Sequence, residues 1–145
     1  IFNNKELPIY AKGKNSREWL HVEAHCEALF TLYLKGRSGE SYNVGSGINL
    51  KNIDLVKKIL KISKLIKIKI GNKSKIKFVK DRPGHDRRYA INSSKIKSEL
   101  SWAPKVNFDE GIKQTIDWYI DNRIWWERVL SGEYRLTRVG LNNDK

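Results

Sequence analysis

Segments with the hydrophobic period of an α-helix alternate with short extended segments along this chain. Helical spacing runs through residues 23–35, after Asn52 and again after Asp109. The extended stretches are residues 7–10, 41–44 and 75–79. Because strands that alternate with helices are typical of α/β domains, this order predicts an α/β fold.

The predicted helices have distinct local signals. In residues 23–35, five apolar side chains share helical spacing: Ala24, Ala28, Leu29, Leu32 and Tyr33. Asn52 is a candidate N-cap for the second helix. The last helix should begin at Asp109 and break near Asn122.

Length and composition agree with one packed domain. The chain has 145 residues, of which 39% are hydrophobic, so it can bury a core of its own. A single cysteine excludes an internal disulfide, and no apolar run approaches the roughly 18 residues of a membrane span. We therefore expect a cytoplasmic protein with no membrane partner. The chain contains no methionine and begins at Ile1, so we expect a piece of a longer protein.

The formal net charge of +13 has two readings. Most of the excess comes from lysines scattered along the chain, as a solvated surface would display them. A nucleic-acid-binding protein usually gathers such residues on one face. We expect no nucleic-acid partner, and a small basic nucleic-acid-binding protein remains the alternative from a different class.

The stretch Lys80–Ile91, KDRPGHDRRYAI, has the composition of an anion site. It places three arginines and one histidine around a Pro-Gly turn. Guanidinium groups match phosphate with paired donors, and glycine lets the backbone approach a ligand closely. The alternative is an exposed turn whose arginines pair with Asp81 and Asp86. Residue chemistry alone leaves both open.

Other motifs are too incomplete to assign chemistry. Tyr10–Lys14 has Tyr-x-x-x-Lys spacing, but Pro8 precedes it and Gly13 interrupts it, so it should form a loop. The Gly45–Gly47 loop lacks the third glycine of a dinucleotide-binding turn. We predict no catalytic residue, no cofactor-binding residue and no metal site in these residues.

Four segments together resemble a known family. They are LPIYAKGKNSREWLHVEAHCEAL, SYNVGSGINLKNIDLV, FVKDRPGHDRRYAINSSKIKSELSWAP and FDEGIKQTIDWYIDNRIWW, in this order. They resemble the C-terminal portion of the dTDP-glucose 4,6-dehydratases, which are NAD-dependent extended short-chain dehydrogenases. The turn Arg82–Asp86 is the most specific part. Related sugar-nucleotide epimerases and decarboxylases share the more general patterns and remain the alternative within the same class.

The resemblance implies that two halves of the full enzyme have different functions. In this family an N-terminal Rossmann half binds NAD, forms the homodimer and carries the groups that oxidise, dehydrate and reduce the sugar. The C-terminal portion, a small mixed sheet with helices, holds the dTDP-sugar. The resemblance thus implies that residues 1–130 bind substrate, that 131–145 form a tail, and that the chain alone is inactive. Residues 42–44 would join the sheet of the missing half, so the chain alone should expose an edge and aggregate.

The resemblance also implies which residues contact the substrate. They are Pro8, Ile9, Tyr10, Arg17, Asn52, Arg82, His85 and Tyr134. Arg17 would face Arg82 and His85 across the diphosphate. From the residues alone, Asn52 could instead be only an N-cap and Tyr10 only a packing residue. Two departures from the family pattern, Ala11–Gly13 and Ser16, put the exact nucleotide preference in doubt.

Overall fold

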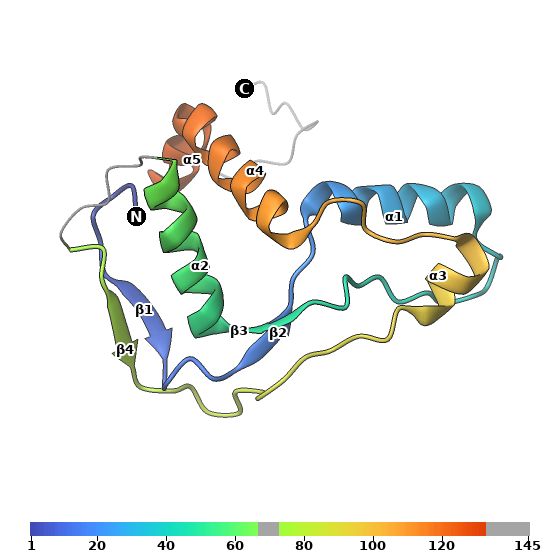
Figure 1. The fold of residues 1–145 in the computed structure, drawn as a ribbon, viewed down its shortest axis with the longest axis horizontal. Coiled ribbons are helices and arrows are strands. Elements are labelled where there is room, and N and C mark those ends of the chain that lie inside the picture. Colours follow the sequence, from blue (N-terminus) through green and yellow to red (C-terminus); the bar gives the residue numbers. More distant parts are fainter. Residues whose placement is uncertain (67–72, 133–145) are drawn as a thin grey trace, which may run out of the picture. The chain divides into compact units, whose positions relative to one another are not determined.

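The computed structural model describes residues 1–66 and 73–132. Figure 1 traces the elements, which follow the predicted alternation of strands and helices. They are β1 (Leu7–Tyr10), β2 (Ser16–Glu18), α1 (Val22–Lys35), β3 (Asn49–Lys51), α2 (Asn52–Leu65), β4 (Ile76–Val79), α3 (Ser94–Leu100), α4 (Phe108–Asp121) and α5 (Arg123–Leu130). The chain divides into two compact units, residues 1–113 and 114–145.

The strands of the first unit form two small sheets, where one mixed sheet was expected. β1 pairs in parallel with β4, and β2 pairs antiparallel with β3 (Figure 1). Left-handed backbone at Ala11 and Gly13 turns the chain between β1 and β2, so the two strands enter different sheets. The predicted α/β class is confirmed.

Gly13 fixes the start of α2 against the turn that follows β1. Its φ of 65° lies in the left-handed region, and a Cβ there would come within 2.8 Å of both Ile9 and Ile53. The amide of Ile53 donates to the carbonyl of Gly13 over 3.1 Å. A side chain at this position would therefore push α2 away from β1.

The core of the first unit lies where α1 packs against α3. Its buried members are Ala24, Ala28, Ile96, Leu100 and Trp102. The helix predicted from this apolar pattern is confirmed, and its two alanines are buried. Leu29 and Tyr33 of the same pattern are 51% and 84% exposed. These two positions belong to an apolar surface of α1 that also includes Phe30 and Leu34, and we call these four side chains the α1 face.

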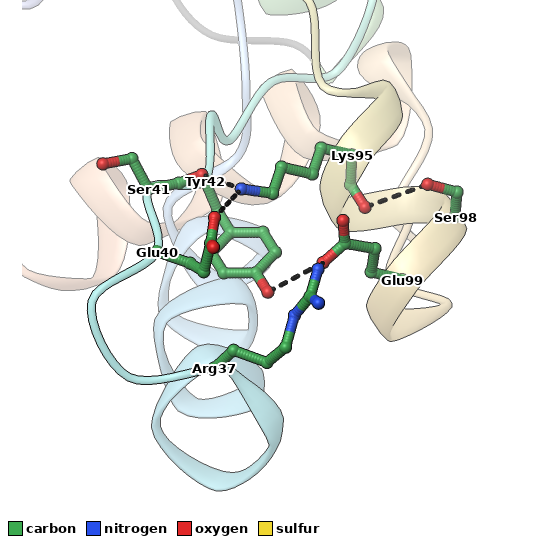
Figure 2. Close-up of polar contacts among 7 residues, drawn as sticks. All are labelled: Arg37, Glu40, Ser41, Tyr42, Lys95, Ser98 and Glu99. Carbon is green, nitrogen blue, oxygen red and sulfur yellow. Dashed lines mark hydrogen bonds and ion pairs between the residues drawn. The ribbon is translucent and has the colours of Figure 1, made fainter.

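Residues 41–44 were predicted to be a strand, and that prediction is wrong for the chain as it stands. No described segment pairs with them, and a strand needs a neighbour for its backbone hydrogen bonds. Side chains of α3 hold the segment instead, as Figure 2 shows. Tyr42 donates to Glu99 over 2.9 Å, and Lys95 donates to the carbonyl of Ser41 over 3.0 Å.

Two ion pairs complete this attachment to α3. Arg37 contacts Glu99 at 2.7 Å, and Lys95 contacts Glu40 at 2.6 Å (Figure 2). The ammonium of Lys95 also lies 4.6 Å from the centre of the Tyr42 ring. We call Arg37, Glu40, Tyr42, Lys95 and Glu99 the α3 polar cluster.

The second unit contains the predicted break. α4 ends at Asp121, and α5 begins at Arg123, with Asn122 between them. The indole N–H of Trp126 donates to the carbonyl of Tyr119 over 2.7 Å, and this ring is 6% exposed. The two helices are thus joined by a buried side chain across the break. No helix within residues 1–66 or 73–132 is long and apolar enough to cross a membrane.

Candidate anion-binding site

The stretch Lys80–Ile91, which we call the arginine-rich loop, is anchored to β2 through its backbone. The amide of Ser16 donates to the carbonyl of Arg87 over 2.9 Å, and the amide of Tyr89 donates to the carbonyl of Ser16 over 3.1 Å. The buried side chain of Asn15 donates to the carbonyl of Asp86 over 3.1 Å. Residues some 70 positions apart in the sequence are therefore held in register, and the loop is no loose surface turn.

Arg17 lies against this loop. Its guanidinium donates to the carbonyl of Asp86 over 3.1 Å and to that of Ser16 over 2.7 Å. Its Cζ atom lies 4.3 Å from the centre of the Tyr89 ring. The Tyr89 hydroxyl donates in turn to the carboxylate of Asp86, and this bond raises the pKa of Tyr89. Stacking and hydrogen bonds together orient Arg17.

Glu18 holds two segments that flank the same region, a role that the sequence did not indicate. One carboxylate oxygen accepts from the amide of Gly47 over 2.8 Å, and the other accepts from the amide of Ile91 over 2.9 Å. A Cβ at Gly45 would come within 2.3 Å of the Glu18 carboxylate. In the sequence, Glu18 is recognisable only as an acidic residue next to Arg17. Nothing near it in the sequence indicates that Gly47 and Ile91 are its hydrogen-bond donors.

His85 is fixed inside the Pro-Gly turn. Its Nδ1 donates to the Asp81 carboxylate over 2.6 Å, and its side chain is 5% exposed. This bond lowers the pKa of Asp81, and the amide of Arg82 donates to the same carboxylate over 3.0 Å. The ring of Tyr10 meets that of His85 edge to face at 5.7 Å. The turn therefore has a defined imidazole orientation, with Tyr10 beside it.

The acidic residues of the loop are not ion-paired with its arginines. Asp81 is engaged by His85, and Asp86 by Tyr89. Arg82 is exposed, and its guanidinium forms no ion pair or hydrogen bond with any residue that the structure describes. This arrangement argues against a turn held by Arg–Asp pairs, and it leaves Arg82 available to an external anion.

The predicted site residues on β1 differ in their exposure to solvent. Pro8 is exposed on β1, whereas Ile9 is buried, with 5% of the residue exposed. Tyr10 is 47% exposed. Tyr134 lies outside the described residues.

Asn52 is the first residue of α2, and the N-cap position belongs to Lys51, so the predicted N-cap is wrong. The backbone N–H of Asn52 donates to the backbone carbonyl of Asn15 over 2.9 Å. This bond ties the start of α2 to the residue that also holds the arginine-rich loop. No hydrogen bond in the described structure joins the side chains of Asn52 and Arg82 directly.

Residues 2–115 match the protein-family model described as GDP-mannose 4,6 dehydratase. The chain belongs to the GDP-mannose 4,6 dehydratase family. The match covers all of the site described above, from β1 to the arginine-rich loop.

Similar proteins within this family share the site region and are much longer. A dTDP-glucose 4,6-dehydratase of Xanthomonas campestris pv. campestris is 49% identical over 137 residues, which are 92% of this chain and 39% of that protein. The dTDP-glucose 4,6-dehydratase of Bacillus anthracis, solved in complex with NAD, is 42% identical. It superimposes with a TM-score of 0.75 over 88% of this chain and 39% of that one.

A second solved relative agrees with this result. The dTDP-glucose 4,6-dehydratase DesIV of Streptomyces venezuelae, also solved with NAD bound, is 37% identical, with a TM-score of 0.78 over 88% of this chain and 38% of that one. The chain thus has the fold of part of an extended short-chain dehydrogenase, and it spans about 39% of the length of the curated relatives it matches.

Proposed function

We propose that this chain is the substrate-holding part of a dTDP-glucose 4,6-dehydratase, a lyase that converts dTDP-glucose to dTDP-4-keto-6-deoxyglucose. The observation that carries the proposal is the position of Arg17, stacked on Tyr89 and hydrogen-bonded to the loop that bears Arg82 and His85. The identity of 49% to a dTDP-glucose 4,6-dehydratase supports it.

Three residues of this site, Arg17, Arg82 and His85, would act on the diphosphate of the nucleotide, and we call them the dTDP clamp. Arg17 and Arg82 supply charge-assisted donors, each contributing about 1.5–3 kcal/mol. Since Nδ1 of His85 is held by Asp81, its Nε2 is the ring nitrogen that can face a ligand. Binding energy at the diphosphate, remote from the reacting sugar, can orient that sugar for reaction.

NAD would be bound by residues outside this chain. The Gly45–Gly47 loop lacks the glycine spacing of a dinucleotide turn, and two of its groups are already engaged, with the Gly47 amide on Glu18 and the Ser46 hydroxyl on the carbonyl of Trp19. This loop therefore does not fit NAD, and we assign no step of the hydride chemistry to the chain. The full enzyme is proposed to be a cytoplasmic homodimer, and inactivity of the isolated chain remains a prediction.

A titration of the chain with dTDP tests the proposal. Arg82→Ala should weaken dTDP binding at least about tenfold, because it removes a charge-assisted donor. Lys80→Ala is the matched control, since Lys80 is an exposed cation of the same loop and should change the affinity less than about twofold. Equal losses in the two variants would contradict a specific clamp.

Two alternative functions give different outcomes. A sugar-nucleotide epimerase or decarboxylase would also bind through the diphosphate, so the product formed from dTDP-glucose by the full-length enzyme separates it from a dehydratase. A nucleic-acid-binding protein would bind random duplex as tightly as dTDP, with an affinity that falls steeply with salt.

A further inference from the structure

A second group of basic residues, two of which belong to the arginine-rich loop, lines an open cavity of about 490 Å³. The lining residues are Lys14, Ser16, Lys51, Arg87 and Arg88. As far as the structure describes the chain, this lining contains no carboxylate. None of the five residues belongs to the proposed dTDP clamp.

Three backbone segments bring these side chains together. Ser16 of β2 lies opposite Lys51 of β3, and on its other side it forms a parallel bridge with Arg88. Paired residues of neighbouring strands project from the same face of a sheet. The side chains of Lys51 and Arg88 therefore flank that of Ser16, whereas Arg17, the next residue along β2, projects from the opposite face.

The cavity holds four positive charges without compensation. Its two lysines and two arginines form no ion pair or side-chain hydrogen bond with any residue in the described ranges. Other cations of the same unit do pair with carboxylates, among them Arg37, Lys58, Lys77, Lys95 and Lys105. Like charges around one cavity repel over distances within the Debye length of about 8 Å at physiological salt, and a bound anion would remove this repulsion.

We infer that this cavity is a second anion site, which binds a small phosphate-bearing ligand. Two guanidinium forks, two ammonium groups and a hydroxyl supply donors of the kind that bind phosphate. The volume lies within the range of about 300–1,000 Å³ typical of small-ligand pockets, whereas single-stranded nucleic acid needs an extended groove with aromatic platforms. The inference stands independently of the function proposed above.

The probe is pyrophosphate, which is titrated calorimetrically into the full 145-residue chain. The chain carries Arg82→Ala, so that the proposed dTDP clamp contributes little to pyrophosphate binding. Adding Lys51→Gln and Arg88→Gln should weaken pyrophosphate binding at least about tenfold. Adding Lys57→Gln and Lys61→Gln, an equal charge change on exposed positions of α2, should change it less than about twofold. Lys14→Gln with Arg87→Gln should weaken pyrophosphate binding to a similar extent, although neither of these residues pairs with Ser16. Circular dichroism checks that each variant is folded.

The outcomes separate this inference from the proposed function. If Arg82→Ala abolishes dTDP binding while pyrophosphate binding still depends on Lys51 and Arg88, both sites are supported. If Arg82→Ala leaves dTDP binding intact, the clamp fails and the cavity is still tested by the Gln pairs. Equal losses in the Lys51/Arg88 variant and the Lys57/Lys61 control would overturn the cavity site. Tight binding of random duplex with no saturable pyrophosphate binding would also overturn it.

Discussion

The guanidinium of Arg17 lies 4.3 Å from the centre of the Tyr89 ring, although 71 residues separate the two in the sequence. This contact joins β2 to the arginine-rich loop beside the hydrogen bond from Arg17 to the carbonyl of Asp86. A guanidinium held on an aromatic ring loses less side-chain freedom when an anion binds. Tyr89 should therefore contribute to dTDP affinity through Arg17.

Substitution of Tyr89 tests that contribution. Tyr89→Leu removes the ring and should weaken dTDP binding by about 0.5–2 kcal/mol, or roughly twofold to thirtyfold. Tyr89→Phe keeps the ring, losing only the hydroxyl that donates to Asp86, and should retain most of the affinity. Calorimetric titration with dTDP measures both. An affinity loss in the Phe variant as large as that in the Leu variant would show that the hydroxyl matters and the stacking does not.

Glu18 should be important for stability. Glu18→Gln replaces one of two carboxylate oxygens, each of which accepts from a backbone amide, with an NH₂ group that cannot accept. We expect the free energy of unfolding to fall by about 1.5–3 kcal/mol, as measured by urea denaturation. Glu23→Gln, an exposed change in the first turn of α1, should cost less than about 1 kcal/mol. Similar losses in the two variants would contradict the bridging role.

The α3 polar cluster predicts a pH dependence of stability. The hydrogen bond from Arg37, and then that from Tyr42, lower the pKa of Glu99, and the bond from Lys95 lowers that of Glu40. A carboxylate with a lowered folded-state pKa stabilises the fold above the ordinary value of about 4.3. That contribution is lost as the pH falls through the folded-state pKa. At the alkaline end, Glu40 raises the pKa of Lys95, so its contribution is lost as the pH rises through that raised value.

Urea midpoints measured between neutral pH and about pH 3 test the acidic limb of this dependence. Glu99→Gln with Glu40→Gln should lower the midpoint at neutral pH and flatten its decline toward low pH. Glu27→Gln is a matched control, because Glu27 meets the exposed Lys105 only at 3.3 Å and its pair should contribute little. An unchanged acid slope in the double variant would contradict the assignment.

The α1 face predicts self-association of the isolated chain. Its members, Leu29, Phe30, Tyr33 and Leu34, are 51–84% exposed, and an apolar patch of this kind favours association. Phe30→Glu with Tyr33→Lys should lower light scattering and leave the urea midpoint nearly unchanged, because neither side chain packs in the core. Equal scattering by the variant and the original chain would place the association elsewhere, for instance at residues 41–44.

Local patterns predicted the helices well, because their signals lie within a few turns. The break at Asn122 and strands β1 and β4 appear where expected. Residues 41–44 illustrate the limit of such patterns, since a strand depends on a partner and no described segment supplies one.

The site shows the same contrast. The sequence singled out the loop as a candidate anion site, and Arg17 does reach it. That the loop binds an anion stays a prediction. The roles of Asn15 and Glu18 depend on contacts with residues about 30 to 70 positions away, which no local period encodes. Likewise, the basic cavity depends on the pairing of Ser16 with both Lys51 and Arg88.

A crystal structure of the chain with dTDP tests the central claim most directly. We expect diphosphate oxygens within about 2.7–3.2 Å of the guanidinium groups of both Arg17 and Arg82, with the imidazole of His85 beside them. A diphosphate that contacts neither arginine, or that lies only among Lys14, Lys51, Arg87 and Arg88, would contradict it.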